Sequence, residues 1–259
     1  MYIYIIELQP LDHRSETEAE DIITEFVAAL IHNGQILSEY MTCKNDKTYY
    51  LYVTSPKSDS LDAHYDSIYV KRSRKLLNEC FAVSIRPNGI NANSREYCTC
   101  KVRSRIEMQT YVSDIDSVFT CCTCGKPIAL YELPYLDNQQ DHWSIINWQK
   151  TYRAMHELWL DSISDRFTGN QLVNVNSTLN KAGREIAKEI EFKTEIKVYY
   201  NVFDDLTKKV RFAKAGDKMT RICPACGKAM KYVKFDDGHD RNICESCGLS
   251  SFPKGERLS

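Results

Sequence analysis

The sequence has no run of apolar residues that approaches the roughly 18 needed for a membrane-spanning helix. Its first residues, MYIYIIELQP, lack the basic start and the cleavage signal of an export peptide and are typical of a strand. Catalytic signatures are missing too: there is no phosphate-binding glycine loop, no G-x-S-x-G and no H-E-x-x-H. These absences favour a cytoplasmic, non-enzymatic protein that has no membrane contact and no small-molecule substrate.

The chain also has little net charge, because 34 Lys and Arg stand against 35 Asp and Glu, a formal −1. This balance argues neither for nor against a nucleic-acid partner. Four thiolates on one Zn²⁺ carry a net −2, so two such sites would bring the chain to about −5. Nucleic-acid binding would therefore need a local basic patch.

Cysteine is abundant, with 11 residues, an odd number of which eight fall in close pairs. Without an export signal, this pattern favours metal binding in a reducing compartment over disulfides. The carboxy-terminal pairs follow C-x2-C-x17-C-x2-C, with a glycine after each pair and Asp236-Asp237-Gly238 as the turn between them. Two intervening residues let one tight turn aim two sulfurs at one ion. The spacing predicts a zinc ribbon with the ligands Cys223, Cys226, Cys244 and Cys247, and leaves His239 as a spare loop residue.

An earlier set of cysteines is less regular. Its halves are a C-x-x-C-G knuckle at Cys121 and a C-x-C pair at Cys98, separated by twenty residues. Cys122 is available as a substitute ligand, and a ribbon that has lost its metal is the alternative. The pattern predicts a second structural zinc on Cys98, Cys100, Cys121 and Cys124. Two isolated thiols, Cys43 and Cys80, lie in apolar contexts and are expected in the core.

The whole chain is predicted to be α+β. Residues 1–90 have the order β-α-β-β-α-β of a ferredoxin-like domain, with a capping box at Ser15 and strands expected at 2–8, 36–43, 48–54 and 81–86. Residues 91–136 are expected to form the first ribbon-like module, 137–212 a mainly helical segment and 213–259 the carboxy-terminal zinc ribbon.

The sequence contains two candidate nucleic-acid-binding surfaces, one formed by aromatic residues and one by basic residues. One sheet face could carry Tyr2, Tyr4, Tyr50 and Tyr52 as a base-stacking platform, although packing against the rest of the chain is the favoured interpretation. Residues 214–259 have nine Lys or Arg against six Asp or Glu. Charge runs are usually solvated surface, and phosphate contact is the alternative. The candidates for phosphate contact are Lys101, Arg103, Arg105, Lys228 and Lys231.

Several segments resemble a proteobacterial family of undefined function, described as Zn-ribbon-containing and as a candidate for nucleic-acid binding. They are CTCGKPIALYELP, ELWLDSISDRF, STLNKAGREI, KVYYNV and the closing CPACG and CESCG, all within about the last 140 residues. The resemblance implies a bacterial protein that binds zinc and nucleic acid, and implies no enzyme activity. The C-x-C pair departs from the more regular knuckle expected of that family.

Two functional hypotheses follow. The first is a non-enzymatic zinc-ribbon protein that binds nucleic acid through basic ribbon surfaces. The alternative is a protein-partner role, such as an immunity or antitoxin protein that neutralises a cognate toxin, which suits a chain of mixed charge without catalytic signatures. An enzyme would need an open zinc position, and a four-thiolate shell leaves none.

Overall fold

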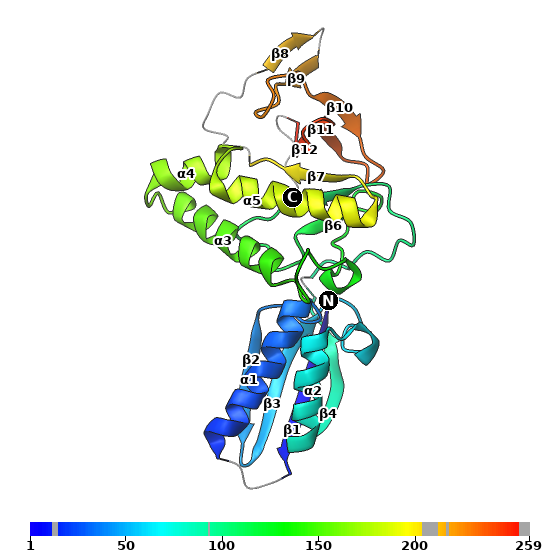
Figure 1. The fold of residues 1–259 in the computed structure, drawn as a ribbon, viewed down its shortest axis with the longest axis vertical. Coiled ribbons are helices and arrows are strands. Elements are labelled where there is room, and N and C mark those ends of the chain that lie inside the picture. Colours follow the sequence, from blue (N-terminus) through cyan, green and yellow to red (C-terminus); the bar gives the residue numbers. More distant parts are fainter. Residues whose placement is uncertain (12–14, 93, 204–211, 216–217, 254–259) are drawn as a thin grey trace. The chain divides into compact units, whose positions relative to one another are not determined.

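The structure is a computed structural model that describes residues 1–11, 15–92, 94–203, 212–215 and 218–253 (Figure 1). The chain forms two compact units. The amino-terminal unit comprises residues 1–97, 115–117 and 127–143, and the carboxy-terminal unit comprises residues 98–114, 118–126 and the described part of 144–259. The division into four segments stays a prediction, since compactness does not reveal which segments fold independently.

The amino-terminal unit is a four-stranded antiparallel sheet with two helices. The sheet order is β2-β3-β1-β4, and both helices lie over one face of it (Figure 1). This confirms the predicted order β-α-β-β-α-β. The elements are β1 (Tyr2–Pro10), α1 (Glu16–Asn33), β2 (Tyr40–Asn45), β3 (Thr48–Ser55), a 3-10 turn (Ala63–Tyr65), α2 (Ile68–Cys80), β4 (Phe81–Ile90) and a second 3-10 turn (Leu130–Glu132).

Local sequence signals explain where these elements begin. The predicted capping box is present: the Glu18 amide donates to Ser15 Oγ at 3.3 Å, and the Ser15 amide donates to Glu18 Oε2 at 3.1 Å. Helix α1 then buries Phe26 and Leu30 against strand residues such as Leu51. Burial of one helix face against one sheet face therefore forms the core of this unit.

The tyrosine platform, the less favoured of the two interpretations of the sequence, does not form, because the four rings do not share one sheet face. Side chains alternate along a strand, and Tyr4 lies on the same face as Ile6, packed against the helix-covered core. Tyr50 and Tyr52 alternate with the buried Tyr49 and so point to the opposite face. The pairing register places Tyr52 opposite Ile5 and not opposite Tyr4.

The two isolated cysteines also differ from each other. Cys80 is buried, as predicted, at the end of α2. Cys43 is exposed, which corrects its assignment to the core. Strand β2, which carries Cys43, begins later than predicted and lies at the sheet edge, where every one of its residues is exposed. Apolar neighbours in sequence do not bury a thiol on such a strand.

The carboxy-terminal unit is built on one six-stranded sheet with the order β10-β11-β12-β7-β5-β6. Strand β7 pairs in parallel with both β12 and β5, so it joins the strands of the two cysteine-bearing segments. The elements are β5 (Ile106–Met108), β6 (Phe119–Cys121), α3 (Trp143–Leu160), α4 (Asp165–Val173), α5 (Thr178–Thr194), β7 (Val198–Asn201), β8 (Phe212–Ala215), β9 (Lys218–Arg221), β10 (Lys231–Lys234), β11 (Asp240–Cys244) and β12 (Leu249–Ser251).

Helix α5 packs directly on β7. A Cβ atom at Gly183 would lie 2.5 Å from the Tyr200 ring and 2.9 Å from Trp148, so only glycine permits this approach. Tyr200 of β7 donates to Asn180 Oδ1 of α5 at 2.6 Å, and Trp148 Nε1 of α3 donates to the Leu179 carbonyl of α5 at 3.0 Å. Among the described helices, none combines the length and the apolar character that a bilayer crossing requires.

A buried ion pair crosses the six-stranded sheet. Arg241 Nε of β11 lies 3.0 Å from Glu107 Oε2 of β5, with the two side chains 2% and 1% exposed. Glu107 Oε1 also accepts from Ser250 Oγ of β12 at 2.6 Å and from Asn201 Nδ2 of β7 at 3.0 Å. One carboxylate therefore ties together four strands of this sheet.

We expect Glu107→Gln to destabilise the protein, because it leaves the buried Arg241 guanidinium without its main counter-charge. Loss of one member of a buried pair costs about 3–5 kcal/mol in comparable cases. Urea unfolding followed by tryptophan fluorescence measures the change. The exposed Glu185→Gln is the matched control and should shift stability by no more than about 0.5 kcal/mol. Equal unfolding midpoints for the two variants would refute the proposed role of the pair.

His142 makes the stability of the amino-terminal unit depend on pH. Its side chain is fully buried beside Tyr135, and burial lowers the pKa of His142 to about 3. The unfolded chain then binds more protons than the folded chain between about pH 6.5 and this value, so stability falls as the pH drops through that window. The loss approaches roughly 1.4 kcal/mol per pH unit.

Hydrogen exchange of peptides from the amino-terminal unit, corrected for intrinsic exchange, measures this slope. We expect His142→Phe to flatten it, whereas His64→Gln, at an exposed histidine of the same unit, should leave it unchanged. A slope that persists in His142→Phe would assign the effect to another group.

Candidate metal centres

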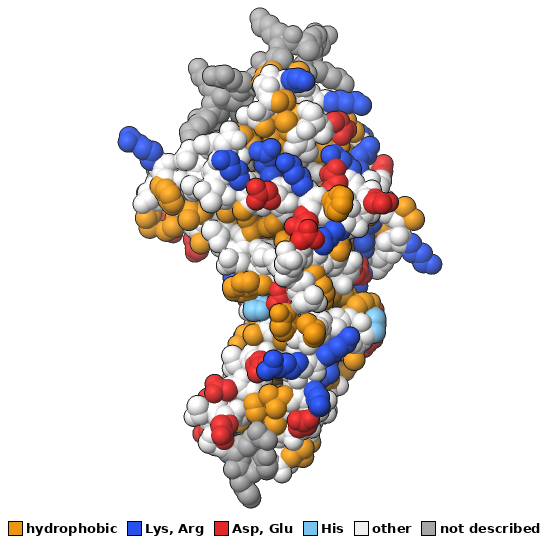
Figure 2. Space-filling model, in the orientation of Figure 1, with side chains coloured by type: hydrophobic (Ala, Val, Ile, Leu, Met, Phe, Trp, Pro, Cys, Tyr) orange, Lys and Arg blue, Asp and Glu red, His pale blue; other side chains and the backbone are white. Residues whose placement is uncertain are grey.

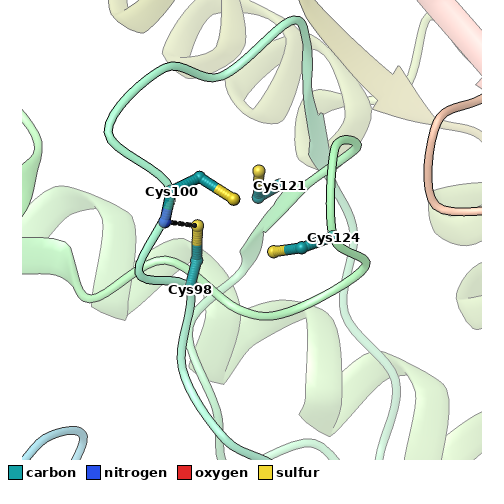
Figure 3. Close-up of side chains that lie close together, drawn as sticks. All are labelled: Cys98, Cys100, Cys121 and Cys124. Atoms are coloured by element: carbon teal, nitrogen blue, oxygen red, sulfur yellow. Dashed lines mark hydrogen bonds between the residues drawn. The ribbon is translucent and has the colours of Figure 1, made fainter.

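Four cysteines of the first set converge in space (Figure 3). Cys98 and Cys100 lie in the irregular segment before β5, Cys121 ends β6, and Cys124 lies in the turn that follows. The four Sγ atoms all lie within 4.8 Å of one another. The structure therefore brings together all four residues predicted from the irregular spacing.

The local backbone explains how the two halves of this tetrad aim their sulfurs. Gly125 has φ 70° and donates its amide to the Cys121 carbonyl at 2.8 Å, which closes the knuckle turn. In the C-x-C half, the Cys100 amide donates to Cys98 Sγ at 3.4 Å (Figure 3). An amide–sulfur bond of this kind stabilises a thiolate, so the shorter spacing still provides a ligand pair.

The second tetrad repeats the knuckle geometry. Gly227, with φ 72°, donates its amide to the Cys223 carbonyl at 2.9 Å, and the Cys223 amide donates to the Lys228 carbonyl at 2.8 Å. The facing turn is closed by the Cys247 amide, which donates to the Cys244 carbonyl at 3.2 Å. The four sulfurs again lie within 4.8 Å of one another.

These distances fit a tetrahedral metal–thiolate centre. Four sulfurs at about 2.3 Å from one ion lie about 3.8 Å from each other. The Cys226 and Cys244 sulfurs are 3.7 Å apart. Each tetrad could therefore hold one metal ion with little rearrangement, and with all four coordination positions taken by protein.

The pKa values of the cysteine thiols determine which of them must release a proton when a metal binds. Burial raises the pKa of Cys124 and of Cys223 to about 12, whereas the Lys228 amide lowers the pKa of Cys226 to about 7. Although burial opposes ionisation of Cys98, the Cys100 amide and Arg103 lower its pKa. A metal binds the thiolate form, so loading must release protons from the buried members.

The alternative ligands weighed from the sequence lie elsewhere. Cys122 packs in an apolar cluster with Tyr199, Phe235 and Ile243, and burial raises its pKa. His239 is exposed in the β10–β11 turn, where its amide donates to Asp237 Oδ1 at 2.9 Å. Neither residue belongs to a cysteine tetrad.

The two cysteine-bearing segments touch each other at the β10–β11 turn. The Asp237 amide donates to the Cys122 carbonyl at 3.0 Å, and Ser104 Oγ donates to Asp236 Oδ2 at 2.7 Å. Phe235 lies beside the guanidinium carbons of Arg105, at 5.4 Å, and Arg241, at 5.7 Å. The turn of one segment thus rests on the knuckle of the other, which links the two candidate centres.

The five basic residues singled out in the sequence occupy different environments. Lys101, Lys228 and Lys231 are exposed. Arg105 is half-buried against Phe235, and the half-buried Arg103 contributes to the ionisation of Cys98. Two of the five therefore have structural contacts. The sequence reasoning missed the Glu107–Arg241 pair, since no spacing links residues so far apart.

Two family models match parts of the chain, and both are described as domains of unknown function. DUF2310 matches residues 100–203 and DUF8589 matches residues 1–88. The first match includes three cysteines of the first tetrad and ends before the second tetrad. The second match covers nearly all of the amino-terminal sheet.

Two uncharacterized proteins of Haemophilus influenzae are similar to the chain. One is 26% identical over 96% of this chain and 97% of its own length, and the other is 33% identical over 48% of this chain. The chain matches 59% of the length of that second relative. Both relatives are bacterial proteins, and neither carries a described activity.

Solved structures give only a distant likeness. The cofactor-independent oxygenase SnoaB from Streptomyces nogalater is 9% identical, covers 36% of this chain and 93% of its own, and has a TM-score of 0.29. A conserved protein from Methanosarcina mazei is 16% identical, covers 35% of this chain and 94% of its own, and has a TM-score of 0.30. These TM-scores are too low for either likeness to carry an argument about this chain.

Because the two tetrads are linked, we predict that loss of metal from one weakens metal binding at the other. We expect Cys98→Ser with Cys100→Ser to remove one of two metal equivalents, measured by inductively coupled plasma mass spectrometry. Because the β10–β11 turn rests on the Cys122 segment, a chelator should also extract the remaining metal faster than from the parent protein. Cys43→Ser, at an exposed thiol outside both tetrads, is the control and should change neither quantity. Unchanged extraction in the double variant would show that the centres are independent.

Proposed function

We propose that this protein is a non-enzymatic zinc protein that binds nucleic acid through strand β10 and the knuckle turn before it. Zinc is the metal best suited to a closed tetrahedral shell of four thiolates, while Mg²⁺ and Ca²⁺ prefer oxygen ligands. Iron also accepts four thiolates, and elemental analysis distinguishes the two metals. A closed shell supports a structural metal, which argues against catalysis at either centre.

The observation that carries the proposal is the composition of this edge strand. Strand β10 lies at the edge of the six-stranded sheet and exposes Lys231 and Lys234, and Lys228 lies exposed in the turn that precedes it. No described carboxylate forms an ion pair with any of these three lysines. Lys231 and Lys234 point to opposite faces of β10, so these free cations lie on both sides of the exposed edge, where the phosphates of a single strand running along it could contact them.

An exposed aromatic ring lies beside Lys234, on the same face of β10. Tyr232 is 42% exposed, and its hydroxyl donates to the Asp240 carboxylate of the neighbouring strand. That bond holds the ring in place, as a stacking platform for a base requires. Lysines on an edge strand also prevent sheets from associating edge to edge. The aromatic ring among them favours the nucleic-acid interpretation, and the salt dependence of binding distinguishes the two.

The other predicted contacts have a smaller part in this proposal. The Arg105 side chain lies on Phe235 and that of Arg103 is half-buried near Cys98, so each would have to leave its contact to reach a phosphate. Lys101 is exposed and free to contribute at the side of the first tetrad. The three lysines around β10 are therefore the main candidates.

A protein partner is the second candidate, favoured by one apolar corner of the carboxy-terminal unit. Leu160, Ile163 and Phe167, at the junction of α3 and α4, are each more than half exposed. Exposed apolar groups that gather in this way often mark protein contacts. Native mass spectrometry of protein purified from its own host separates the candidates. One defined protein companion favours this role, and heterogeneous nuclease-sensitive mass favours nucleic acid.

We expect Lys228→Glu, Lys231→Glu and Lys234→Glu together to abolish most binding to a labelled single-stranded oligonucleotide. Each phosphate contact contributes about 0.7 to the slope of log K against log salt for single strands, so the loss of three should flatten that slope by about 2. Fluorescence anisotropy at several salt concentrations measures the slope.

An equal charge change in the amino-terminal unit is the control: Lys47→Glu, Lys71→Glu and Lys75→Glu. This variant has the same net charge and should retain most of the salt slope. If both triple variants lose affinity equally, the effect is one of net charge, and β10 is not the binding surface. Binding that does not depend on salt in the parent protein would also exclude it.

A further inference from the structure

A cleft of about 220 Å³ lies beside the second tetrad, within the carboxy-terminal unit. Its walls are one face of α5, the start of β7 and the knuckle turn from Glu245 to Gly248. The cleft therefore touches the second knuckle of the tetrad, and Lys228 follows the first knuckle of the same tetrad. Figure 2 shows Lys and Arg side chains gathered on the surface over α5, with acidic side chains among them.

The acidic residues of the cleft are already engaged. Glu191 Oε1 lies 2.9 Å from Lys197 Nζ, and Glu191 Oε2 accepts from the Val198 amide at 3.0 Å. Glu245 Oε2 accepts from the Tyr199 hydroxyl at 2.7 Å. These contacts balance Lys197 and leave both carboxylates committed to the protein.

Two cations of the cleft have no such partner. Arg184 and Lys188 lie one turn apart on α5, and neither forms an ion pair with a described carboxylate. Arg184 Nε is buried and has no hydrogen-bond acceptor among the described residues, while its Nη1 makes only a 3.5 Å contact to the Val175 carbonyl. A buried donor without an acceptor is costly, so an anion that accepted from it would be bound favourably.

We propose that this cleft, here called the α5 cleft, binds a phosphate group, and that the nucleic acid proposed above supplies it. This inference rests on the proposed function. The cleft is smaller than the roughly 300 Å³ at which sites for drug-sized ligands begin, which suits one phosphate better than a whole nucleotide. Arg184 provides a planar donor pair and Lys188 a point charge, the two kinds of group that bind phosphates.

The position of the cleft agrees with a continuous path for one strand. Strands β7 and β10 are separated by three interstrand spacings, or about 14 Å. The turn that holds Cys226 leads into Lys228 and β10, and the turn that holds Cys247 lines the cleft. The metal of the second tetrad would therefore fix both phosphate sites relative to each other.

Lys188→Gln tests this inference, because the side chain is exposed and its loss spares the core. The matched control is Lys181→Gln, an exposed lysine of the same helix that lies outside the cleft. With a labelled oligothymidine as the probe, we expect Lys188→Gln to flatten the salt slope by about 0.7 and Lys181→Gln to leave it unchanged. Arg184→Gln should have at least the effect of Lys188→Gln, provided that it folds.

Inorganic phosphate is the second probe. The readout is the chemical shift of the backbone amide NMR signals of Ser246 and Gly248. Shifts in the parent that vanish in Lys188→Gln support the cleft. If phosphate shifts these signals but oligothymidine does not bind, the cleft stands, its source is a free phosphate, and the proposed nucleic-acid function fails. If oligothymidine binds equally to parent and Lys188→Gln and phosphate shifts neither signal, the cleft is refuted while the role of β10 survives.

The cations could instead serve only to balance the thiolates of the second tetrad, since Cys247 lines the cleft. Metal content and chelator extraction of Lys188→Gln distinguish this case. Faster metal loss with an unchanged salt slope would overturn the phosphate site.

Discussion

The buried pair of Glu107 and Arg241 is the constraint on which the carboxy-terminal unit depends. It joins β5, which lies beside the first tetrad, to β11, which ends at Cys244 of the second. Two opposite charges inside a sheet are tolerated only when their hydrogen bonds are satisfied, and Asn201 and Ser250 complete those of the carboxylate. Correct strand pairing is therefore required before the charges are neutralised, which favours one register for the four strands that these residues join.

This constraint changes how the two cysteine sets are understood. Small cysteine-rich hairpins depend on metal because they bury little apolar surface alone. Here the hairpins of both sets pair with the common strand β7, whose residues are all buried, and α5 covers it. The sheet shares its core between the two centres, and the β10–β11 turn connects them a second time through Cys122. Metal binding and sheet formation should then stabilise each other.

In the same arrangement, the arginines near the first tetrad make structural contacts, whereas the lysines around the second tetrad are exposed to solvent. Arginines near the first tetrad are held by rings and sulfur, where their planar guanidinium groups pack well. Lysines around the second tetrad remain exposed, on strand β10 and on α5. Under the proposed function, a rigid knuckle between these two cationic sites would present phosphate contacts at a fixed spacing, and the metal would position them.

Short-range signals could be read from the sequence with good success. The capping box at Ser15, the order β-α-β-β-α-β, the α+β class and both tetrads depend on spacings of a few residues or on local periodicity, and the structure has them. Contacts between distant segments could not be read in this way. The tyrosine platform failed because alternation along β1 and the pairing register, and not the presence of tyrosines, decide which face a ring occupies. The Glu107–Arg241 pair, the union of both hairpins in one sheet and the two unpaired cations of the α5 cleft arise only when strands far apart in sequence become neighbours. Local spacing in the sequence determines which cysteines form each knuckle. The pairing of distant strands in the tertiary structure determines which charged side chains are buried, paired or left without a partner.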